Sequence, residues 1–495
     1  MKYLLTILAI LGLSYHMHGQ KIVKTIKSQV TKAGLESKLR FLASDELRGR
    51  DTGSPELDIA AVYIAENFRS YGLKVPDGMN DYFQPVKLIE RSPVKKAIVE
   101  LGGKSAKKND DILFLNGSDG DFEGDLIFLN YGSEADYEGK DANGKIVVVL
   151  PGDKDTSNPR EYLPLSTQKQ KLAQKNGALG VIELYKNAQT PWKLVVNALS
   201  RSGMELNMND EVEEESPVFL AWLNDLEGKW ENMVRPSPST GIVSLRGAGN
   251  NNINSKNVIG WIEGKHPEKK KEFLVMTAHY DHVGVRMIAP GQDSIFNGAR
   301  DNAIGVATLL ETAKLLSKVQ PDYSVVFIAF TAEEKGLLGS RWYAEYPVFP
   351  LNKTFFNFNT DGGGYNSTEI ATVIGLNRTG VTSNLEKSVV PFGLKVTDDP
   401  APEQNLFDRS DNVSFARKGI PALTFSCGLT AFDAEIMKYY HQTADEVESM
   451  DMDYLVKYAR SFVYAAYLIA NSKEKPFWNS GDKYEAAGKE LYGIN

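Results

Sequence analysis

Apolar residues recur with the period of a helix in some parts of the chain and form short continuous runs in others, and this difference predicts the elements. Between Ser54-Pro55 and Gly72 the period is that of a helix, with Pro at its start and Gly after its end. The apolar positions of this predicted helix are Leu57, Ala60, Ala61, Ile64 and Phe68. The same period returns in DNAIGVATLLETAKLLSKV, residues 301–319. We therefore expect two helices that each bury one apolar face.

From residue 257 onward, mainly apolar runs alternate with helical segments. EFLVMTA, SVVFIAF, FFNFNT and IPALTFS are short and are bounded by polar loops, which is typical of buried strands. A terminal helix, DYLVKYARSFVYAAYLIANS, follows them. Such alternation favours a sheet with helices on both faces. We predict an α/β fold with a mixed, mostly parallel sheet flanked by helices.

The pattern differs between residues 96 and 248. Short apolar runs such as KIVVV and GVIELY lie between Gly and Asp clusters, which predicts a small β-rich α/β domain inserted into the first. The polar stretch GNNNINSK marks the expected junction. We therefore expect five segments: a signal peptide at 1–19, the first part of the main domain at 20–95, the insert at 96–248, the rest of the main domain at 249–475, and a tail at 476–495.

The first residues, MKYLLTILAILGLSYHMHGQ, predict a signal peptide that is cleaved near Gly19. One lysine precedes an apolar run that is too short to span a bilayer comfortably. We expect an exported protein, either periplasmic or secreted. No later apolar run approaches the length of about 18 residues that a transmembrane helix needs.

Composition narrows the class of protein. The chain has 495 residues, of which 42% are hydrophobic and 24% are charged, as in soluble globular proteins. Its net charge of −8 argues against a nucleic-acid partner. The single cysteine, Cys427, excludes an intrachain disulfide. Nothing in the sequence indicates an oligomeric state.

Polar residues follow the predicted strands, where open α/β sheets bind ligands. Histidine, aspartate and glutamate without cysteine form a set that suits divalent metals such as zinc. Each position alone is weak, because a strand-end histidine is usually structural and an aspartate at a helix start usually caps the helix. The prediction rests on their convergence at one edge of the sheet. The candidates are His279, Asp281, His282, Asp301, Glu333, Glu334, Asp361 and His441.

In this order and spacing, the motifs resemble peptidase family M28, a family of co-catalytic zinc aminopeptidases. The resemblance covers roughly residues 35–90 and 250–475. It rests on H-x-D at 279–281, G-A-x-D-N-A-x-G at 298–305, A-E-E-x-G-x-x-G-S at 332–340, Asp361 and His441. The insert, with GKIVVVLPGD and KLAQKNGALGVIELY, is similar to a protease-associated (PA) domain.

The resemblance implies two zinc ions per chain and assigns their ligands. Asp301 would bridge the two ions. His279 and Asp361 would complete one site, and Glu334 and His441 would complete the other. The charges agree with this assignment, because three carboxylates and a bridging hydroxide balance two divalent ions.

The remaining roles also follow from the resemblance. Glu333 would be the general base for a metal-bridging water that acts as nucleophile. Asp281 would orient His279. Tyr440 would donate a hydrogen bond to the oxyanion or would simply pack. For His282 we expect a structural role, and the peptide bond that follows Asp301 is expected to be cis.

These roles predict an exported di-zinc exopeptidase, a metallo-aminopeptidase that hydrolyses N-terminal residues from peptides. The ligands do not encode polarity, so a carboxypeptidase or a glutaminyl cyclase-like enzyme on the same fold stays open, as does a non-catalytic binding module. G-x-S-x-G and H-E-x-x-H are absent, which disfavours a serine hydrolase and a zincin. Two positions depart from the family pattern: Arg300, where an acidic residue is frequent, and Asn412, where histidine is common.

Overall fold

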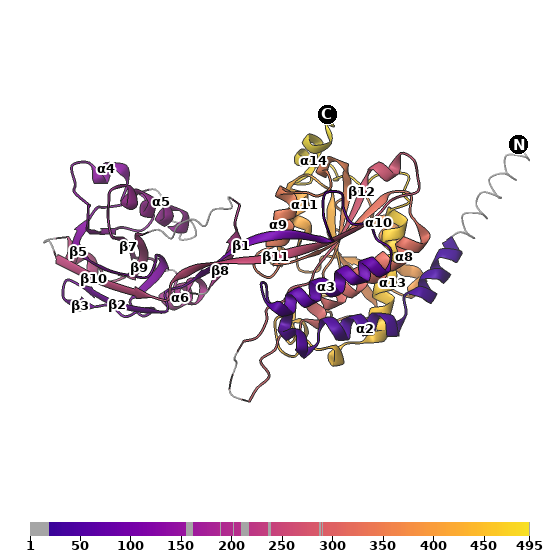
Figure 1. The fold of residues 1–495 in the computed structure, drawn as a ribbon, viewed down its shortest axis with the longest axis horizontal. Helices are drawn as coiled ribbons and strands as arrows, with labels where there is room; N and C mark the ends of the chain where they lie inside the picture. The colour runs from indigo at the N-terminus through magenta and orange to yellow at the C-terminus, as the bar shows by residue number, and fades with distance from the viewer. Residues whose placement is uncertain are drawn as a thin grey trace, which may run out of the picture. The chain divides into compact units, whose positions relative to one another are not determined.

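The computed structural model describes residues 19–154, 162–188, 190–200, 202–208, 217–235, 239–286, 289 and 291–494 (Figure 1). The chain forms two compact units. We call the one built from residues before Lys87 and after Ile253 the split unit, and the one at Lys87–Ile253 the inserted unit. The predicted signal peptide lies outside the described residues except for Gly19, which is the first described residue of a helical stretch that continues to residue 29.

A mixed sheet has most of its strands in the split unit, whereas β8 and parts of β1 and β11 fall within residues 87–253. Its strand order is β16-β15-β17-β14-β12-β13-β11-β1-β8. The neighbours β17, β14, β12 and β13 run parallel, whereas β11 is antiparallel to β13 and β15 is antiparallel to β17. The strands are β1 (Phe83–Ser92), β8 (Gly203–Leu206), β11 (Gly249–Ile262), β12 (Phe273–His279), β13 (Ser324–Phe330), β14 (Thr354–Thr360), β15 (Ile370–Ile374), β16 (Lys395–Asp398) and β17 (Ala422–Ser426).

Both faces of this sheet are covered, so its central strands β13 and β14 are buried along their whole length. Along β13, Val325, Phe327 and Ala329 join one hydrophobic core, while Val326 and Ile328 join the core on the other face. The first core packs against α2 (Lys32–Leu42), α3 (Pro55–Ser70), α8 (Ile304–Val319), α10 (Thr382–Val389) and α13 (Met452–Ile469). The second packs against α9 (Leu338–Glu345), α11 (Asn412–Arg417) and α14 (Glu485–Tyr492).

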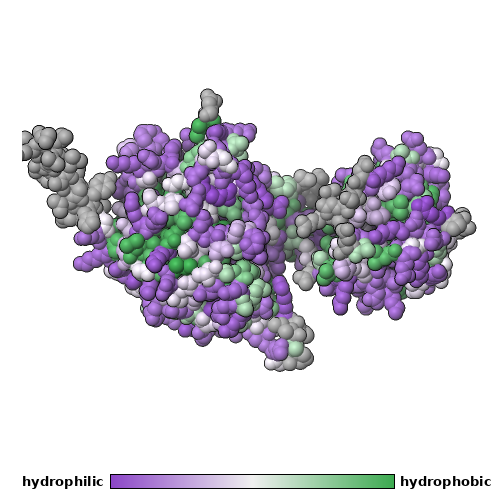
Figure 2. All heavy atoms as spheres, turned by 180° about the vertical axis from the view of Figure 1, so that it is seen from behind, coloured by the Kyte–Doolittle hydropathy of each residue, from purple (hydrophilic) through white to green (hydrophobic). Residues whose placement is uncertain are grey.

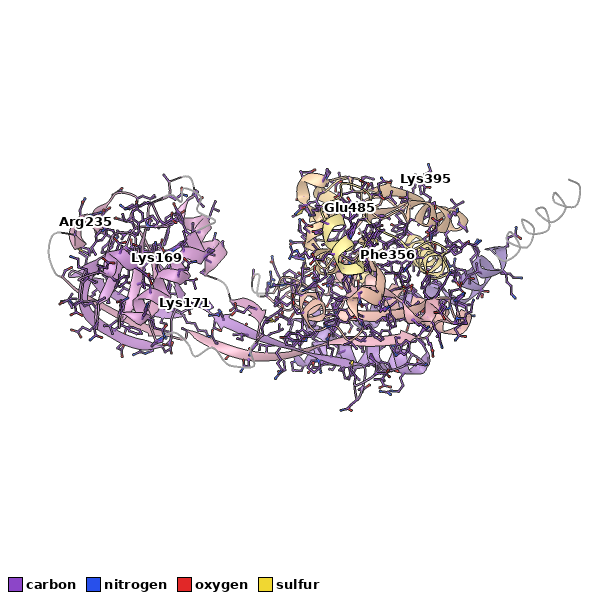
Figure 3. The ribbon with its side chains drawn as sticks, turned by 90° about the horizontal axis from the view of Figure 1, so that it is seen from above. Lys169, Lys171, Arg235, Phe356, Lys395 and Glu485 are labelled. Carbon is purple, nitrogen blue, oxygen red and sulfur yellow. The ribbon has the colours of Figure 1, made fainter. Side chains whose placement is uncertain are left out.

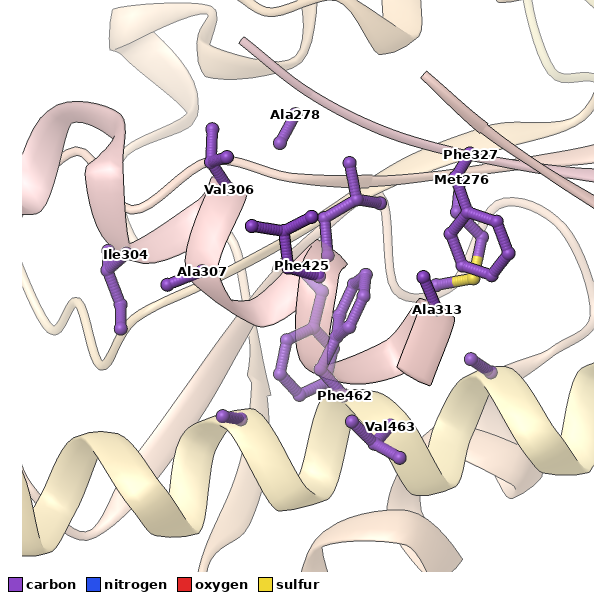
Figure 4. Packing of buried hydrophobic residues seen from close by; sticks show 14 of the residues in the cluster. Met276, Ala278, Ile304, Val306, Ala307, Ala313, Phe327, Phe425, Phe462 and Val463 are labelled. Atoms are coloured by element: carbon purple, nitrogen blue, oxygen red, sulfur yellow. The ribbon is translucent and has the colours of Figure 1, made fainter. Parts of the chain in front are cut away.

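Aromatic packing joins α13 to the sheet. The ring of Phe462 in α13 lies 5.7 Å from the ring of Phe425 in β17, between centroids (Figure 4). Phe462 also stacks on Phe358 of β14, with centroids 4.4 Å apart. On the face drawn in Figure 2, hydrophilic residues predominate. Among the described residues, no helix combines the length and the apolar character needed to span a membrane.

The inserted unit has its own sheet, in the order β3-β2-β10-β5-β6-β7-β9-β4, and its own hydrophobic cores. Its strands are β2 (Lys96–Leu101), β3 (Lys104–Ser105), β4 (Ile112–Asn116), β5 (Gly120–Phe128), β6 (Ile146–Val149), β7 (Gly180–Tyr185), β9 (Phe219–Asn224) and β10 (Ser239–Arg246). Its helices are α4 (Glu134–Tyr137), α5 (Tyr162–Lys175), α6 (Trp192–Leu199) and α7 (Lys229–Val234).

A buried ion pair holds α5 to the sheet of the inserted unit. Lys169 Nζ donates to Glu183 Oε1 at 2.9 Å, and both side chains are buried (Figure 3). Glu183 also accepts hydrogen bonds from Gly152 N, at 2.7 Å, and from the hydroxyl of Ser166. All of these groups belong to this unit, so it contains a polar network of its own.

The chain passes from one unit to the other inside two strands, β1 and β11. The polar stretch at 249–256, whose composition is typical of a loop, therefore belongs to β11. Strand pairing has overridden local propensity here, as it often does in sheets.

Candidate metal centre

The polar residues that follow the strands of the split unit meet at one edge of the sheet. His279 is the last residue of β12, and Asp361 directly follows β14. Glu333 and Glu334 lie in the turn between β13 and α9. Asp301 lies in the turn before α8, at a peptide bond with Asn302 that is cis, as expected.

Asp301 faces two histidines at once. Its Oδ1 lies 3.2 Å from His279 Nε2, and its Oδ2 lies 3.2 Å from His441 Nε2. His279 Nε2 is also 3.7 Å from Asp361 Oδ1. His441 Nε2 is 3.1 Å from Glu334 Oε2. Each oxygen of Asp301 thus belongs to a different histidine–carboxylate set.

These donor atoms suit metal ions better than they suit one another. The buried Nε2 of His279 has no hydrogen-bond partner among the described residues, although Asp301 is close. A cation between such groups would satisfy atoms that are otherwise buried without a partner. Ligand atoms within 4.8 Å of one another form two groups in the described chain: His282, Asp301, Glu334 and His441, and His279, Glu333 and Asp361.

The two adjacent glutamates have opposite electrostatic environments. Burial raises the pKa of Glu333 well above its usual range, and the charges of Glu334 and Asp361 add to the effect. Burial and Asp301 would also raise the pKa of Glu334, but hydrogen bonds with His282 and His441 lower it to about 2. Glu333 therefore holds a proton readily, while Glu334 stays ionised.

Asp281 joins the histidine strand end to the glutamate turn. Its carboxylate accepts hydrogen bonds from the backbone N–H groups of Glu333, at 3.1 Å, and Glu334, at 3.2 Å. Its backbone carbonyl lies 3.2 Å from His279 Nδ1, closer than its carboxylate at 3.9 Å. Burial raises the pKa of Asp281 to about 6. Asp281 thus contacts its predicted partner, His279, and also the glutamate turn; its carbonyl is the group nearest to the imidazole.

Tyr440 packs against His441 and also lines the cavity beside the centre. Its ring stacks on His441 with centroids 4.1 Å apart, which is packing. Its hydroxyl accepts a hydrogen bond from Arg409 Nη2 at 3.1 Å and lines the cavity beside the centre. The phenol is therefore held next to the metal-ligand candidates with its proton free to be donated.

Buried polar residues hold the loops of the centre, and local sequence patterns do not reveal them. Arg50 donates to Tyr280 O at 2.9 Å and to Asn297 O at 2.7 Å, so it ties together the loops that carry Asp281 and Asp301. Asn302 Oδ1 accepts from Gly362 N at 2.9 Å. These contacts join segments far apart in sequence, and only the fold brings them together.

Three further residues near the centre had no assigned part in the predicted chemistry. His282 is buried, and its Nδ1 lies 2.8 Å from Glu334 Oε1. Asp445 accepts from the backbone N–H groups of Arg300, at 2.9 Å, and Asp301, at 3.2 Å. Ser410 donates to Asp361 Oδ2 at 2.7 Å. The sequence offered a weak signal for Asp445, because it follows His441 in the same polar loop.

The two departures from the family pattern have structural explanations. Arg300 is buried, pairs with Asp445 at 3.2 Å and lies 3.7 Å from the centroid of the Tyr439 ring. Asn412 is buried, donates to Phe407 O at 3.1 Å and accepts from Thr424 Oγ1 at 2.9 Å. Both side chains therefore form contacts that hold neighbouring segments near the centre together.

The protein is therefore an α/β protein with a candidate metal centre. Imidazoles and carboxylates meet beyond the strand ends of its mixed sheet, where such folds bind ligands. Residues 257–466 match the model of peptidase family M28. The matched segment contains every predicted ligand.

Known proteins are similar in sequence over part of the chain or in fold. Aminopeptidase YwaD of Bacillus subtilis is 33% identical over 233 residues, which are 45% of this chain and 46% of that protein. A vacuolar membrane protease of Lodderomyces elongisporus is 25% identical over 209 residues, 42% of this chain and 20% of that protein. The chain thus spans less than half the length of these curated relatives.

A solved structure is similar over almost the whole chain. The aminopeptidase from Aneurinibacillus sp. strain AM-1 covers 92% of this chain and 97% of its own, with 24% identity and a TM-score of 0.57. This likeness confirms the predicted fold class.

Proposed function

We propose that the protein is a metallo-aminopeptidase. It would bind two zinc ions and use them to remove N-terminal residues from peptides. The observation that carries this proposal is the position of Asp301, whose two oxygens each lie 3.2 Å from a different imidazole. Such a carboxylate can bridge two ions. The match to peptidase family M28 and the similarity to an aminopeptidase support the same class of reaction.

Each ion would have its own ligands in addition to Asp301. His279 and Asp361 would hold one, and Glu334 and His441 would hold the other. The ions, when bound, would activate a water molecule and polarise the peptide carbonyl. His282 lies close enough to Glu334 to keep that carboxylate in place.

Glu333 would move the proton. It stands outside the proposed ligand set, and burial makes its carboxylate a stronger base than an exposed glutamate. It would take the proton from the attacking water and deliver it to the leaving amine. Asp281 would hold the turn that carries Glu333, and the Tyr440 hydroxyl would stabilise the developing oxyanion.

The same proposal extends to the ends and the insert of the chain. Residues 1–19 would direct export and would be removed, which N-terminal sequencing of the protein recovered outside the cell would test. The inserted unit would be a PA-like domain, a proposal that its compact β-rich sheet supports.

A peptide library tests the activity and its polarity together. Half of the peptides would carry free N-termini and half acetylated ones, each incubated with and without a chelator and read by mass spectrometry. Stepwise, chelator-sensitive trimming of the free peptides alone is expected. Trimming from the C-terminus would instead indicate a carboxypeptidase, and no cleavage by metal-loaded protein would favour a non-peptide substrate or a binding module.

Paired variants test the division between the two glutamates. Glu333→Ala should keep both metal ions and lose about 10²- to 10⁴-fold in kcat, the usual contribution of a general base. Glu334→Ala should lose metal. Metal content and kcat would be measured beside Glu386→Ala, a control at an exposed glutamate of α10. Equal metal content and equal residual activity in the first two variants would refute the division.

A further inference from the structure

The cavity beside the metal centre has a cationic wall that the proposed chemistry does not use. The cavity has a volume of about 500 Å³, and Arg341, Arg409 and Arg417 line it. Arg341 comes from α9 and Arg417 from the end of α11, two helices that touch through a 2.9 Å hydrogen bond between Ser340 and Ser414.

Two of these guanidinium groups have no hydrogen-bond or ion-pair partner among the residues that the structure describes. Arg409 donates to the Tyr440 hydroxyl. Arg341 and Arg417 are exposed, and neither side chain makes a hydrogen bond or an ion pair within the described part of the chain. The acid nearest along α9, Glu345, is already paired with Lys418 at 2.9 Å.

The acidic groups that line the same cavity already have other partners, either the proposed metal ions or neighbouring side chains. Asp301, Glu333, Glu334 and Asp361 belong to the metal centre, where two divalent ions would balance their charge. The fifth acid, Asp408, accepts hydrogen bonds from Lys483 Nζ at 2.6 Å and from Tyr484 at 3.0 Å. With both metal ions bound, the cavity would therefore carry excess positive charge, which attracts an anionic ligand.

The rest of the wall is largely apolar. Ile374, Leu406, Leu429, Phe432 and Ile436 line it. A guanidinium fork matches the two oxygens of a carboxylate, and apolar walls suit the short aliphatic stem that carries it. This combination favours a carboxylate on an aliphatic stem over a bare inorganic anion, which has no stem.

We infer that Arg341 and Arg417 bind a carboxylate of the peptide substrate. The inference rests on the proposed function and restricts the class of preferred peptide substrates to those with a suitably placed carboxylate. The carboxylate has two possible sources: the side chain of an N-terminal aspartate or glutamate, or the free C-terminus of a short peptide. Both present the same chemistry to the arginines.

The test compares kcat/KM of the zinc-loaded wild type with that of Arg341→Gln, Arg417→Gln and the double variant. One arm uses Glu-, Asp- and Leu-p-nitroanilide, which have no C-terminal carboxylate. The other uses Leu-Gly-Gly with a free or an amidated C-terminus. Lys395→Gln, at an exposed position of β16 outside this cavity, is the matched control (Figure 3).

In at least one arm, the ratio of kcat/KM for the carboxylate substrate over its neutral partner should fall about tenfold or more in the double variant. This is the size expected when hydrogen bonds to a charged group are lost. Lys395→Gln should leave the ratio unchanged. The arm that responds identifies the source of the carboxylate, and circular dichroism establishes that each variant is folded.

Failure of this inference and failure of the proposed function would give different results. If both ratios stay constant while the neutral substrates are cleaved, the inference is wrong and the aminopeptidase proposal stands. If the metal-loaded wild type cleaves none of the substrates, the proposed function fails and the inference fails with it.

Discussion

At the scale of single residues, His282 was expected to be structural only, but it directly contacts a proposed metal ligand, Glu334. Its Nδ1 contacts Glu334, and its buried Nε2 has no hydrogen-bond partner in the described structure. Residues that hold a metal ligand in place are worth about 10- to 100-fold in metal affinity. His282→Ala should therefore weaken metal binding by about this factor.

A chelator competition would measure this loss through the metal retained at each chelator concentration. His266→Ala is the control, because His266 lies in an exposed turn of the same unit and its Nδ1 accepts hydrogen bonds only from the backbone N–H groups of Glu268 and Lys269 among the described residues. Equal retention in the two variants would show that His282 does not support the centre.

Glu446 gives a prediction about pH. Burial raises its pKa from 4.5 to about 7, and the charge of Asp45 adds to the effect. Between these pH values the folded state binds the proton more strongly than the unfolded chain does, so the free energy of unfolding falls as pH rises. Glu446→Gln should therefore stabilise the protein at pH 8, by about 1 kcal/mol after allowance for solvent screening, and not at pH 4.

Urea unfolding of wild type and variant at both pH values would measure this difference. Comparing the two proteins at the same pH removes any effect that they share, including that of bound metal. Glu474→Gln, at an exposed glutamate, is the control and should show no pH-dependent gain. A gain at pH 4 equal to that at pH 8 would contradict the titration argument.

The sequence predicted where the metal-ligand candidates meet better than it predicted what holds them. His279, Glu334 and Asp361 are recognisable because each follows a short buried strand, a local pattern. The contact between His282 and Glu334 joins residues 52 positions apart. Such contacts depend on how loops close, and local periodicity carries no information about that.

At the scale of elements, a buried ion pair joins α2 to α8. Lys38 Nζ lies 2.6 Å from Glu311 Oε1, with side-chain exposures of 10% and 0%. Lys38→Met would leave Glu311 buried without this cation, which typically costs about 3–5 kcal/mol. The double variant Lys38→Met/Glu311→Leu should recover most of the lost stability, because it removes both charges.

The midpoint of urea unfolding would measure these effects. Lys32→Met is the matched control on the same helix, because Lys32 pairs with Asp453 at the surface, with exposures of 49% and 78%. Such exposed pairs contribute about 0–1 kcal/mol. Similar losses for Lys38→Met and Lys32→Met would show that burial does not set the strength of the pair.

Elements with local signals were predictable, and those defined by distant pairing were not. The predicted helix after Ser54 is α3, and Ser54 Oγ accepts from Leu57 N at 3.1 Å, as a helix cap does. Its signal lies within a few residues. The strand at 249–256 gave none, because its polar residues become a strand only beside partners from elsewhere in the chain.

At the scale of the whole molecule, the two units should unfold separately and respond differently to metal. All proposed ligands lie in the split unit, and each unit has its own hydrophobic cores. A chelator should therefore lower the melting temperature of one calorimetric transition only. Removing bound metal destabilises the state that binds it, by an amount that grows with affinity.

A variant identifies the other transition. Lys169→Met leaves Glu183 without its cation in the inserted unit and should lower the melting temperature of the transition that the chelator leaves in place. Differential scanning calorimetry of both proteins, with and without chelator, would measure the two shifts. A chelator shift in both transitions, or a single transition throughout, would show that the units are coupled.

The interruption of the split unit by the inserted unit has a consequence for synthesis on the ribosome. The apolar faces of α2 and α3 are completed by α8 and α13, which are encoded after the insert. At about 5–20 residues per second, α13 is made roughly 20 to 80 s after α3. Until α13 is made, the first two helices lack at least one of these partners. The insert is continuous in sequence and can complete its own cores first, so we expect the nascent chain to fold from its middle outward.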